Sequence, residues 1–272
     1  MFKSSKFDGI LVCMGLGQAF LWWFSVSNFS ILSGIQITAC GIAMIVLLCT
    51  NYQCISHNFI HNKFFKWQSL NTIFSIVNSM ALGMPQSMYE AHHINHHIHS
   101  NDRWNGFKKP RDRSSLYYYG ENGEQEPLLR YTFMSYFRLN VIKLFGEAYT
   151  RNSALAVTEL MTLLSFCGWL IWINYLAFFL FCIPIHFLGT SIASMENYAE
   201  HDRCDPSDNQ RNSVSCYNRL YNFLWFNNGF HQEHHLEPDV HWTKLPKVKE
   251  QLLESKDRIV VKGCHLLGLL EK

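Results

Sequence analysis

The chain has 272 residues, 48% of them hydrophobic and 15% aromatic, and its formal charge is +2. The charge is small and the sequence contains no basic arm, so proteins that bind nucleic acids through such an arm are excluded. The nine cysteines form no CxxC pair and have no regular spacing, so a secreted disulfide scaffold is also excluded and the cysteines are expected to remain thiols.

Four apolar windows are long enough to cross a bilayer, which requires about 20 apolar residues per helix. They cover about 9–26, 31–50, 154–172 and 175–195. The connections within each pair are very short, which is typical of antiparallel hairpins. We therefore expect an all-α membrane protein with four transmembrane helices in two hairpins. A helical cap formed by 51–153 and 196–272 completes a single domain that covers 1–272.

The basic residues predict the orientation of these helices. None of the 23 Lys and Arg residues lies in an apolar window or in the short connections, so all of them fall on one side of the membrane. The positive-inside rule makes that side cytoplasmic. The sequence thus predicts a multi-pass protein of a bacterial inner membrane or an endoplasmic reticulum, with its cap in the cytoplasm. The apolar stretch 67–89 is interrupted by polar residues and is expected to form an interfacial or buried helix.

Histidines gather in four short patterns outside the apolar windows. These patterns are His57-x3-His61, His92-His93-x2-His96-His97, Asn197-x3-His201 and His231-x2-His234-His235. Residues three or four apart share one face of a helix, so each pattern directs imidazoles to a common side. Imidazole binds iron, zinc and copper, and nine of these ten histidines shared by two metal ions would leave each ion four or five ligands. A zinc hydrolase is the chemical competitor, but a zinc site needs only three or four ligands and no HExxH motif is present.

The ordered patterns resemble a known family. His57-x3-His61, His93-x2-His96-His97 and His231-Gln-Glu-His234-His235-Leu-Glu-Pro238 resemble the three histidine boxes of membrane fatty acid desaturases. Asn197-Tyr-Ala-Glu-His201 resembles the additional ligand segment of acyl desaturases, and the likeness extends from about residue 10 to 245. The resemblance implies nine metal ligands and a metal contact of Asn197 through a bound water. The implied ligands are His57, His61, His93, His96, His97, His201, His231, His234 and His235.

The resemblance also implies the chemistry. It suggests two Fe ions in a di-iron centre that uses O2 to introduce a double bond into a long-chain acyl lipid within the membrane. Electrons must come from an external donor, either a ferredoxin or a b-type cytochrome with its reductase. No dinucleotide-binding fingerprint is present in this chain to hold a flavin or nicotinamide of its own.

Several alternatives remain open at this point. His92 shifts the second box by one residue and is a possible alternative ligand to His93. The same scaffold would also suit a lipid or carotenoid hydroxylase or ketolase. A non-enzymatic metal transporter or sensor is a third possibility, although it should carry histidines or acidic residues along its spans. The motifs leave open the position of the double bond, the chain length, the acyl carrier, the electron donor and the oligomeric state.

Other polar residues are expected to play supporting roles. His186, inside the fourth window, should be buried and hydrogen-bonded or line a substrate tunnel. Glu159 is expected at the membrane interface, and His241 and His265 at the surface. Five acidic neighbours of the boxes are candidates to accept hydrogen bonds from ligand histidines, namely Glu90, Asp102, Glu200, Asp202 and Glu233.

Overall fold

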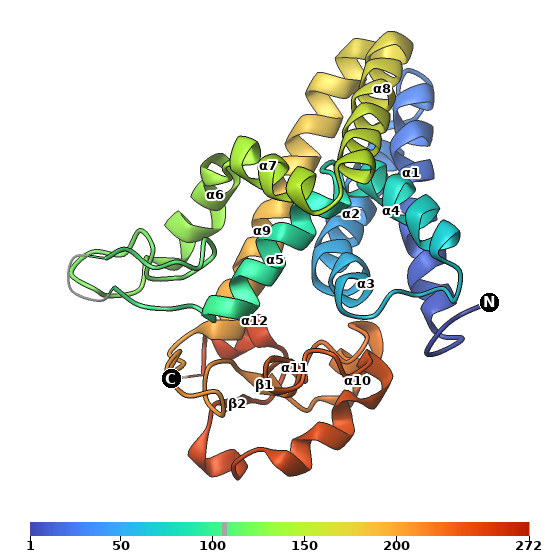
Figure 1. The fold of residues 1–272 in the computed structure, drawn as a ribbon. Helices are drawn as coiled ribbons and strands as arrows, with labels where there is room; N and C mark the ends of the chain where they lie inside the picture. The colour runs from blue at the N-terminus through green and yellow to red at the C-terminus, as the bar shows by residue number, and fades with distance from the viewer. Residues whose placement is uncertain (105–107, 272) are drawn as a thin grey trace. The chain divides into compact units, whose positions relative to one another are not determined.

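The computed structural model describes residues 1–104 and 108–271 and is mainly helical, as predicted (Figure 1). Residues 105–107 and 272, which belong to the expected cap, lie outside this description. The chain divides into two compact units. Unit 1 comprises 1–91 and 139–193, and unit 2 comprises 92–138 and 194–272. The division falls inside α5 (Gln86–His99) and α9 (Ile183–His201), so each of these helices contributes residues to both units.

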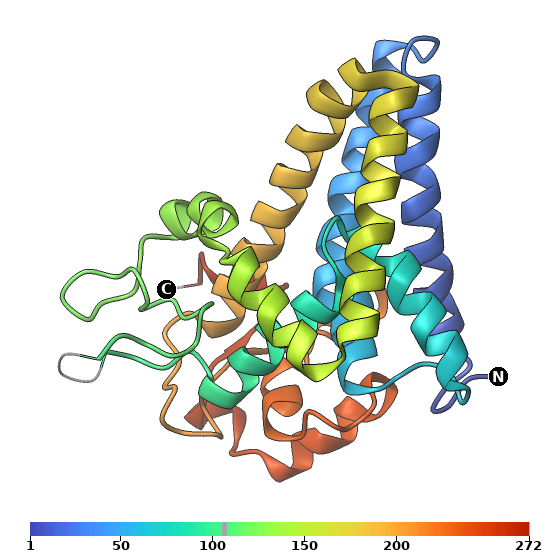
Figure 2. The ribbon, with the colours of Figure 1, turned by 45° about the horizontal axis from the view of Figure 1, so that its top comes forward.

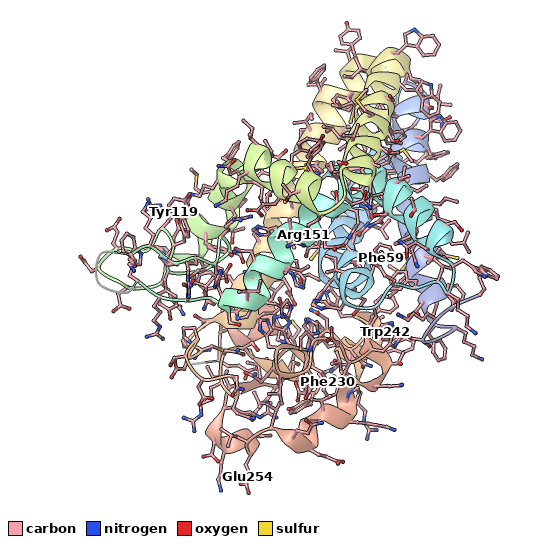
Figure 3. All side chains as sticks on the ribbon, viewed as in Figure 1. Phe59, Tyr119, Arg151, Phe230, Trp242 and Glu254 are labelled. Atoms are coloured by element: carbon pink, nitrogen blue, oxygen red, sulfur yellow. The ribbon has the colours of Figure 1, made fainter. Side chains whose placement is uncertain are left out.

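Unit 1 contains the long apolar helices, which lie roughly along one another (Figure 2). Besides its parts of α5 and α9, its elements are α1 (Asp8–Asn28), α2 (Gly34–Thr50), the π-helix η1 (Asn51–Ser56), α3 (His57–His61), α4 (Gln68–Leu82), α7 (Val141–Arg151), α8 (Ser153–Ala177) and the π-helix η2 (Phe178–Cys182). Helix α1 packs against α2, α4 and α8. Phe59 of α3, labelled in Figure 3, makes edge contacts with Phe64 and with Phe74 of α4 at centroid distances of 5.3 and 4.9 Å.

Three helices in the described part of the chain are long and apolar enough to cross a membrane. They are Asp8–Asn28, Gly34–His61 and Ser153–His201, with 21, 28 and 49 residues. The first two contain most of the predicted windows 9–26 and 31–50. Helix α2 begins later than predicted because Ser33 and Gln36 form a capping box, in which each side chain bonds to the other residue's backbone N–H. The third helix covers both remaining windows.

Asn174 interrupts that third helix. Its backbone angles, φ −159° and ψ 93°, are not helical. Its side-chain oxygen accepts a hydrogen bond from the N–H of Ala177 at 3.0 Å, which is the pattern of an N-cap residue. Its amide nitrogen also lies 3.4 Å from the hydroxyl of Ser30, in the loop that joins α1 to α2. A new helical segment therefore starts after the predicted connection 173–174.

Helix α4 accounts for the interrupted apolar stretch 67–89. It has 15 residues, fewer than a membrane span requires, and four of its polar residues are buried, namely Asn71, Ser75, Asn78 and Ser79. Buried Asn78 donates hydrogen bonds to the side chains of Ser56 and Gln86, each at 2.8 Å. Ile73 is instead 56% exposed. The buried polar interruptions therefore serve hydrogen bonds inside unit 1, as expected for a buried helix, whereas Gln68 at the start of α4 is exposed.

Glu159 of α8 is buried inside unit 1, and its depth at the membrane interface stays a prediction. Its carboxylate accepts hydrogen bonds from the hydroxyl of Ser75 at 2.5 Å and from the N–H of Ser87 at 2.9 Å. Ser87 lies in the first turn of α5, where a helix has unsatisfied N–H groups and favours negative charge. Glu159 thus joins α8 to α4 and to the beginning of the helix that carries the second histidine box.

Unit 2 is built from short elements. Besides its parts of α5 and α9, these are α6 (Leu128–Arg138), β1 (Ser215–Cys216), α10 (Arg219–Leu224), α11 (His231–Leu236), the 3-10 helices η3 (Trp242–Gln251) and η4 (Ser255–Asp257), β2 (Val260–Val261) and α12 (His265–Gly268). The two strands pair in parallel, with Ser215 opposite Val260. Trp242, labelled in Figure 3, packs edge-on against Phe226 at a centroid distance of 5.7 Å. The third histidine box lies in α11.

Candidate metal centre

Four histidines of unit 2 converge in a buried cluster, which we call the four-histidine group. Its members are His96, His201, His231 and His235. Their potential ligand nitrogens lie within 4.8 Å of one another. The Nε2 atom of His201 is 3.0 Å from Nε2 of His96 and 3.2 Å from Nε2 of His231. Two nitrogens bound to one ion at about 2.1 Å, at a right angle, would lie about 3.0 Å apart. The spacing therefore matches that of ligands around a single metal ion.

The hydrogen bond made by one ring nitrogen determines whether the other nitrogen of the same ring has a lone pair for a metal. Nδ1 of His201 lies 2.9 Å from the backbone carbonyl oxygen of Asn212, and since a carbonyl only accepts, Nδ1 must donate. The neutral ring then has a lone pair on Nε2, directed at two other Nε2 atoms. A single hydrogen bond can join Nε2 of His201 to only one of these two atoms, whereas a metal ion binds all the lone pairs at once. The donor arrangement thus fits a metal ion.

His235 gives independent support for this fit. Its ring centre lies 4.7 Å from that of His231 and 4.8 Å from that of His201. Both ring nitrogens are buried, and neither has a hydrogen-bond partner among the described residues. Burial and then the surrounding imidazoles hold the pKa of His235 well below its ordinary value, so the ring is neutral. A buried polar group without a partner is costly, and a metal ion would remove that cost.

Asp112 supports His96 from behind, at a position that the sequence analysis did not single out. Its Oδ2 atom accepts a hydrogen bond from Nδ1 of His96 at 2.7 Å, and both side chains are buried. Burial acts to lower the pKa of His96, but the Asp112 carboxylate outweighs this effect and raises the pKa. Burial likewise acts to raise the pKa of Asp112, and the His96 imidazole with hydrogen bonds from Ser114 outweighs it and lowers the pKa. A carboxylate behind an imidazole is the usual partner of a metal-bound histidine.

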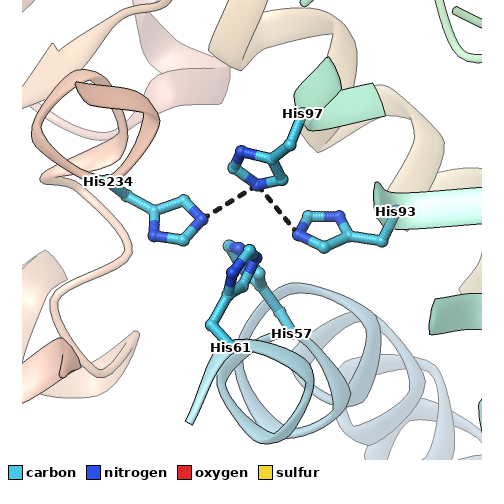
Figure 4. A group of neighbouring side chains, drawn as sticks. All are labelled: His57, His61, His93, His97 and His234. Carbon is cyan, nitrogen blue, oxygen red and sulfur yellow. Dashed lines mark hydrogen bonds between the residues drawn. The ribbon is translucent and has the colours of Figure 1, made fainter. Parts of the chain in front are cut away.

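A second set in unit 2, the three-histidine group, consists of His93, His97 and His234 (Figure 4). Nε2 of His97 lies 3.0 Å from Nε2 of His93 and 3.1 Å from Nε2 of His234, as the dashed lines show. His92 belongs to neither group. The register of the second box that includes His93, which the resemblance favours, is therefore the one that brings the imidazoles together.

The first box lies in unit 1, on α3. His57 and His61 have ring centres 5.3 Å apart, as their spacing of one helical turn predicts (Figure 4). Nδ1 of His57 donates to the carbonyl oxygen of Gln53 at 2.9 Å, which leaves the lone pair of a neutral ring on Nε2. Gln53 belongs to the π-helix η1, whose six residues are all buried. Its amide donates in turn to the carbonyl oxygen of Ala193 at 2.9 Å, which anchors this part of the π-helix.

Comparison with known sequences is decisive about the family. The sequence model of the family described as "Fatty acid desaturase" matches residues 32–260, which is most of the chain. The chain belongs to the fatty acid desaturase family. No curated protein and no solved structure matches it. The match contains all nine histidines expected as ligands, ends before α12, and supports a desaturase- or hydroxylase-like activity. With its three apolar helices, it places the chain among membrane proteins.

Two further polar residues of the chain have direct partners. The amide of Asn197 donates to the hydroxyl of Tyr131 at 2.8 Å, and its contact with a metal through water stays a prediction. In the fourth predicted window, Nε2 of His186 lies 3.1 Å from the carbonyl oxygen of Leu82. The next residue, Gly83, has φ +73° and ends α4, and a Cβ there would lie 2.5 Å from His186. His186 is thus hydrogen-bonded, as in the first of the two roles expected for it, but it is only partly buried.

The acidic neighbours of the boxes have diverse partners. Glu90 pairs with Lys63 at 3.0 Å and Asp202 with Arg203 at 2.8 Å. Asp102 accepts the backbone N–H groups of Arg111 and Asp112, at 3.0 and 2.9 Å, and so shapes the loop that presents Asp112.

Glu233, within the third box, is buried and has three side-chain partners. The hydroxyl of Tyr217 donates to Oε1 at 2.5 Å and that of Ser215 to Oε2 at 2.8 Å. The guanidinium of Arg258 lies 3.7 Å from Oε1. Burial, followed by the Glu233 charge, raises the pKa of Tyr217 to about 12, so this phenol stays protonated and donates. Glu233, which lies between His231 and His234 in the sequence, thus attaches α11 to Ser215, Tyr217 and Arg258.

The expectation that His241 and His265 lie at the surface is wrong. His241 is 4% exposed and its ring nitrogen caps η3 by accepting the N–H of Thr243. His265 is 1% exposed and lies beside the carboxylates of Glu196 and Glu200. Burial acts to lower the pKa of His265, but the two glutamates raise that pKa to about 9. A lone histidine near the end of a chain carries no spacing pattern, so the sequence alone could not reveal this cluster.

Proposed function

We propose that this chain is an O2-dependent membrane fatty acyl desaturase that introduces a double bond into a long acyl chain. Convergence of the histidine Nε2 lone pairs in a buried site is the observation that carries the proposal. Each turnover consumes one O2, two electrons and two protons, removes two hydrogens from adjacent carbons, and releases two waters. The electrons come from an external ferredoxin or from a b-type cytochrome with its reductase.

The proposed cofactor is a pair of Fe ions held by the nine histidines of the resemblance, with Asn197 acting through a bound water. When bound, the irons supply the oxidising power, drawn from O2, that an unactivated C–H bond requires. The protein keeps the imidazoles neutral and orients their nitrogens toward the site of the metal. The Asn212 carbonyl fixes the tautomer of His201, while Asp112 orients His96. Burial of both residues excludes bulk water from the site, which protects an oxidising reaction from side reactions.

We also propose that unit 1 crosses the membrane four times, in two hairpins whose basic flanking segments face the cytoplasm. The helix restart at Asn174 and its contact with Ser30 in the other connection support this topology. Alkaline phosphatase fused after Ser30 or after Asn174 is expected to be active, because both sites would be outside the cytoplasm. Fusions after Asn62 or Asn152 are expected to be inactive. An inactive fusion after Asn174, with a correctly inserted first hairpin, would leave Ser153–His201 without the proposed reversal.

The activity is tested by mass spectrometry of total lipids from a host that expresses the chain with an electron donor. We expect fatty acids two hydrogen atoms lighter than those of the host, and their absence when His234 and His235 are both replaced by alanine. Derivatisation of the double bond then locates it. Products one oxygen atom heavier would instead identify a hydroxylase on the same scaffold. An unchanged acyl profile from a folded, iron-loaded protein with a working electron donor would contradict the acyl substrate.

A further inference from the structure

A cluster of buried charges lies beside the four-histidine group and has no assigned role. Glu196 and Glu200 are one turn apart on α9, and both carboxylates are buried. Nδ1 of His265, from α12, lies 3.4 Å from Oε1 of Glu196 and 3.5 Å from Oε1 of Glu200. One imidazole therefore bridges two carboxylates that would otherwise repel each other at close range.

The remaining hydrogen bonds fix each carboxylate in one orientation. The hydroxyl of Tyr221 donates to Oε1 of Glu196 at 2.5 Å and approaches Nδ1 of His265 at 3.1 Å. The amide of Asn228 donates to Oε1 of Glu200 at 2.6 Å. With Oε1 of Glu200 occupied by these partners, its Oε2 atom faces the four-histidine group.

That second oxygen lies close to a ligand candidate. Oε2 of Glu200 lies 3.7 Å from Nε2 of His231, the same nitrogen that faces His201 in the four-histidine group. Glu200 thus places negative charge next to a nitrogen that would bind the metal. The orientation of this charge depends on the contacts made at Oε1.

We propose that His265 is a positioning residue, which holds Glu196 and Glu200 so that the carboxylate of Glu200 stays beside Nε2 of His231. The proposal rests on the proposed function in one respect, namely that the four-histidine group holds a metal ion. It makes the C-terminal helix α12, which lies beyond the family match, a working part of the metal centre. The imidazole already supplies the cation that the two glutamates need, so no third metal ion is required in this cluster.

The test uses the full-length protein in detergent, stripped of metal and titrated with cobalt(II). Two cobalt equivalents are expected for the unmodified chain. In His265→Gln, one equivalent should bind about 10- to 100-fold more weakly, the typical effect of losing a residue that supports a metal ligand. Its visible absorption bands should also shift, while the other equivalent stays unchanged. Glu200→Gln should act in the same direction, and the double variant should lose little more than either single one, because both changes break one linked unit.

The matched control is His241→Gln, the same substitution at another buried histidine of unit 2 that contacts Thr243. It should bind both equivalents normally. Unchanged cobalt affinity and spectrum in His265→Gln and Glu200→Gln would overturn the inference while leaving the proposed function intact. A third equivalent that disappears in His265→Gln would overturn it too, in favour of a separate metal site. If the folded unmodified chain binds no cobalt, the metal centre itself fails, and this inference fails with it. Glu200→Gln carries the test alone if His265→Gln does not fold.

Discussion

Replacing His235 with alanine is expected to abolish lipid desaturation and to lower the bound iron from about two ions per chain to about one. His235 is the member of the four-histidine group whose two ring nitrogens have no partner among the described residues, so a metal ion is the natural partner. Its loss should affect the ion held with His96, His201 and His231, and spare the three-histidine group. Iron and protein are measured in the same purified sample, by plasma mass spectrometry and by amino-acid analysis.

The matched control for this experiment is His92→Ala, because His92 lies in the second box but outside both histidine groups. It should keep both iron ions and the desaturated products, whereas His93→Ala should lose iron. Loss of iron from His92→Ala with retention in His93→Ala would reverse the register of the second box. Full iron content in His235→Ala would remove this residue from the ligand set.

Replacing Arg258 with methionine is expected to destabilise the protein by about 3–5 kcal/mol, because it leaves the buried carboxylate of Glu233 without its cation. Arg258 also donates to the hydroxyl of Ser215 at 2.9 Å, to the carbonyl oxygen of Leu253 at 3.0 Å, and to the hydroxyl of Tyr217. The guanidinium therefore joins α11 to Ser215, Tyr217 and Leu253. A loss of this size should lower Tm by roughly 10 °C, measured by the unfolding of the protein in detergent.

A second variant separates charge from packing. The double variant Arg258→Met/Glu233→Gln removes both members of the pair and should recover much of the lost stability, since replacing both charges costs less than orphaning one. Exposed Lys256, which pairs with Glu254 at the surface, provides the control. Lys256→Met should change Tm little, because exposed ion pairs contribute little. A similar drop in Tm for the single and double variants would show that packing, and not the buried charge, accounts for the effect of Arg258.

Local spacing explains which parts of the site could be predicted from the sequence. Histidines three or four residues apart share a helix face whatever the rest of the chain does, so the pairs His57/His61 and His93/His97 follow directly from their spacing. Apolar length likewise predicts the long helices. The meeting of two apolar windows predicts the connection at 173–174, and the structure adds that the side chain of Asn174 acts there as an N-cap.

The partners of the ligands could not be found in the same way. Asp112 lies among the basic residues Lys108, Lys109, Arg111 and Arg113, so its local surroundings suggest a solvated loop. Its contact with His96 depends on tertiary folding and on the Asp102 carboxylate, which binds the loop backbone. The burial of Glu159 is hidden from the sequence for a related reason, because only the fold reveals the donors that surround its carboxylate.

The π-helix η1 has a consequence for how the first histidine box tolerates changes in chain length. A π-turn has a wider circumference than an α-turn, so these six buried residues set the rotational phase at which α3 begins. Because a π-helical hydrogen bond spans five residues in place of four, a π-turn accommodates an extra residue. Deleting one residue of η1 is therefore expected to close the π-turn into an α-turn and to leave the direction of His57 and His61 nearly unchanged. Deleting one residue within α2 would instead turn both histidines by about 100° about the helix axis, with their mutual spacing intact. The direction of this box thus depends on where in the helix the chain length changes.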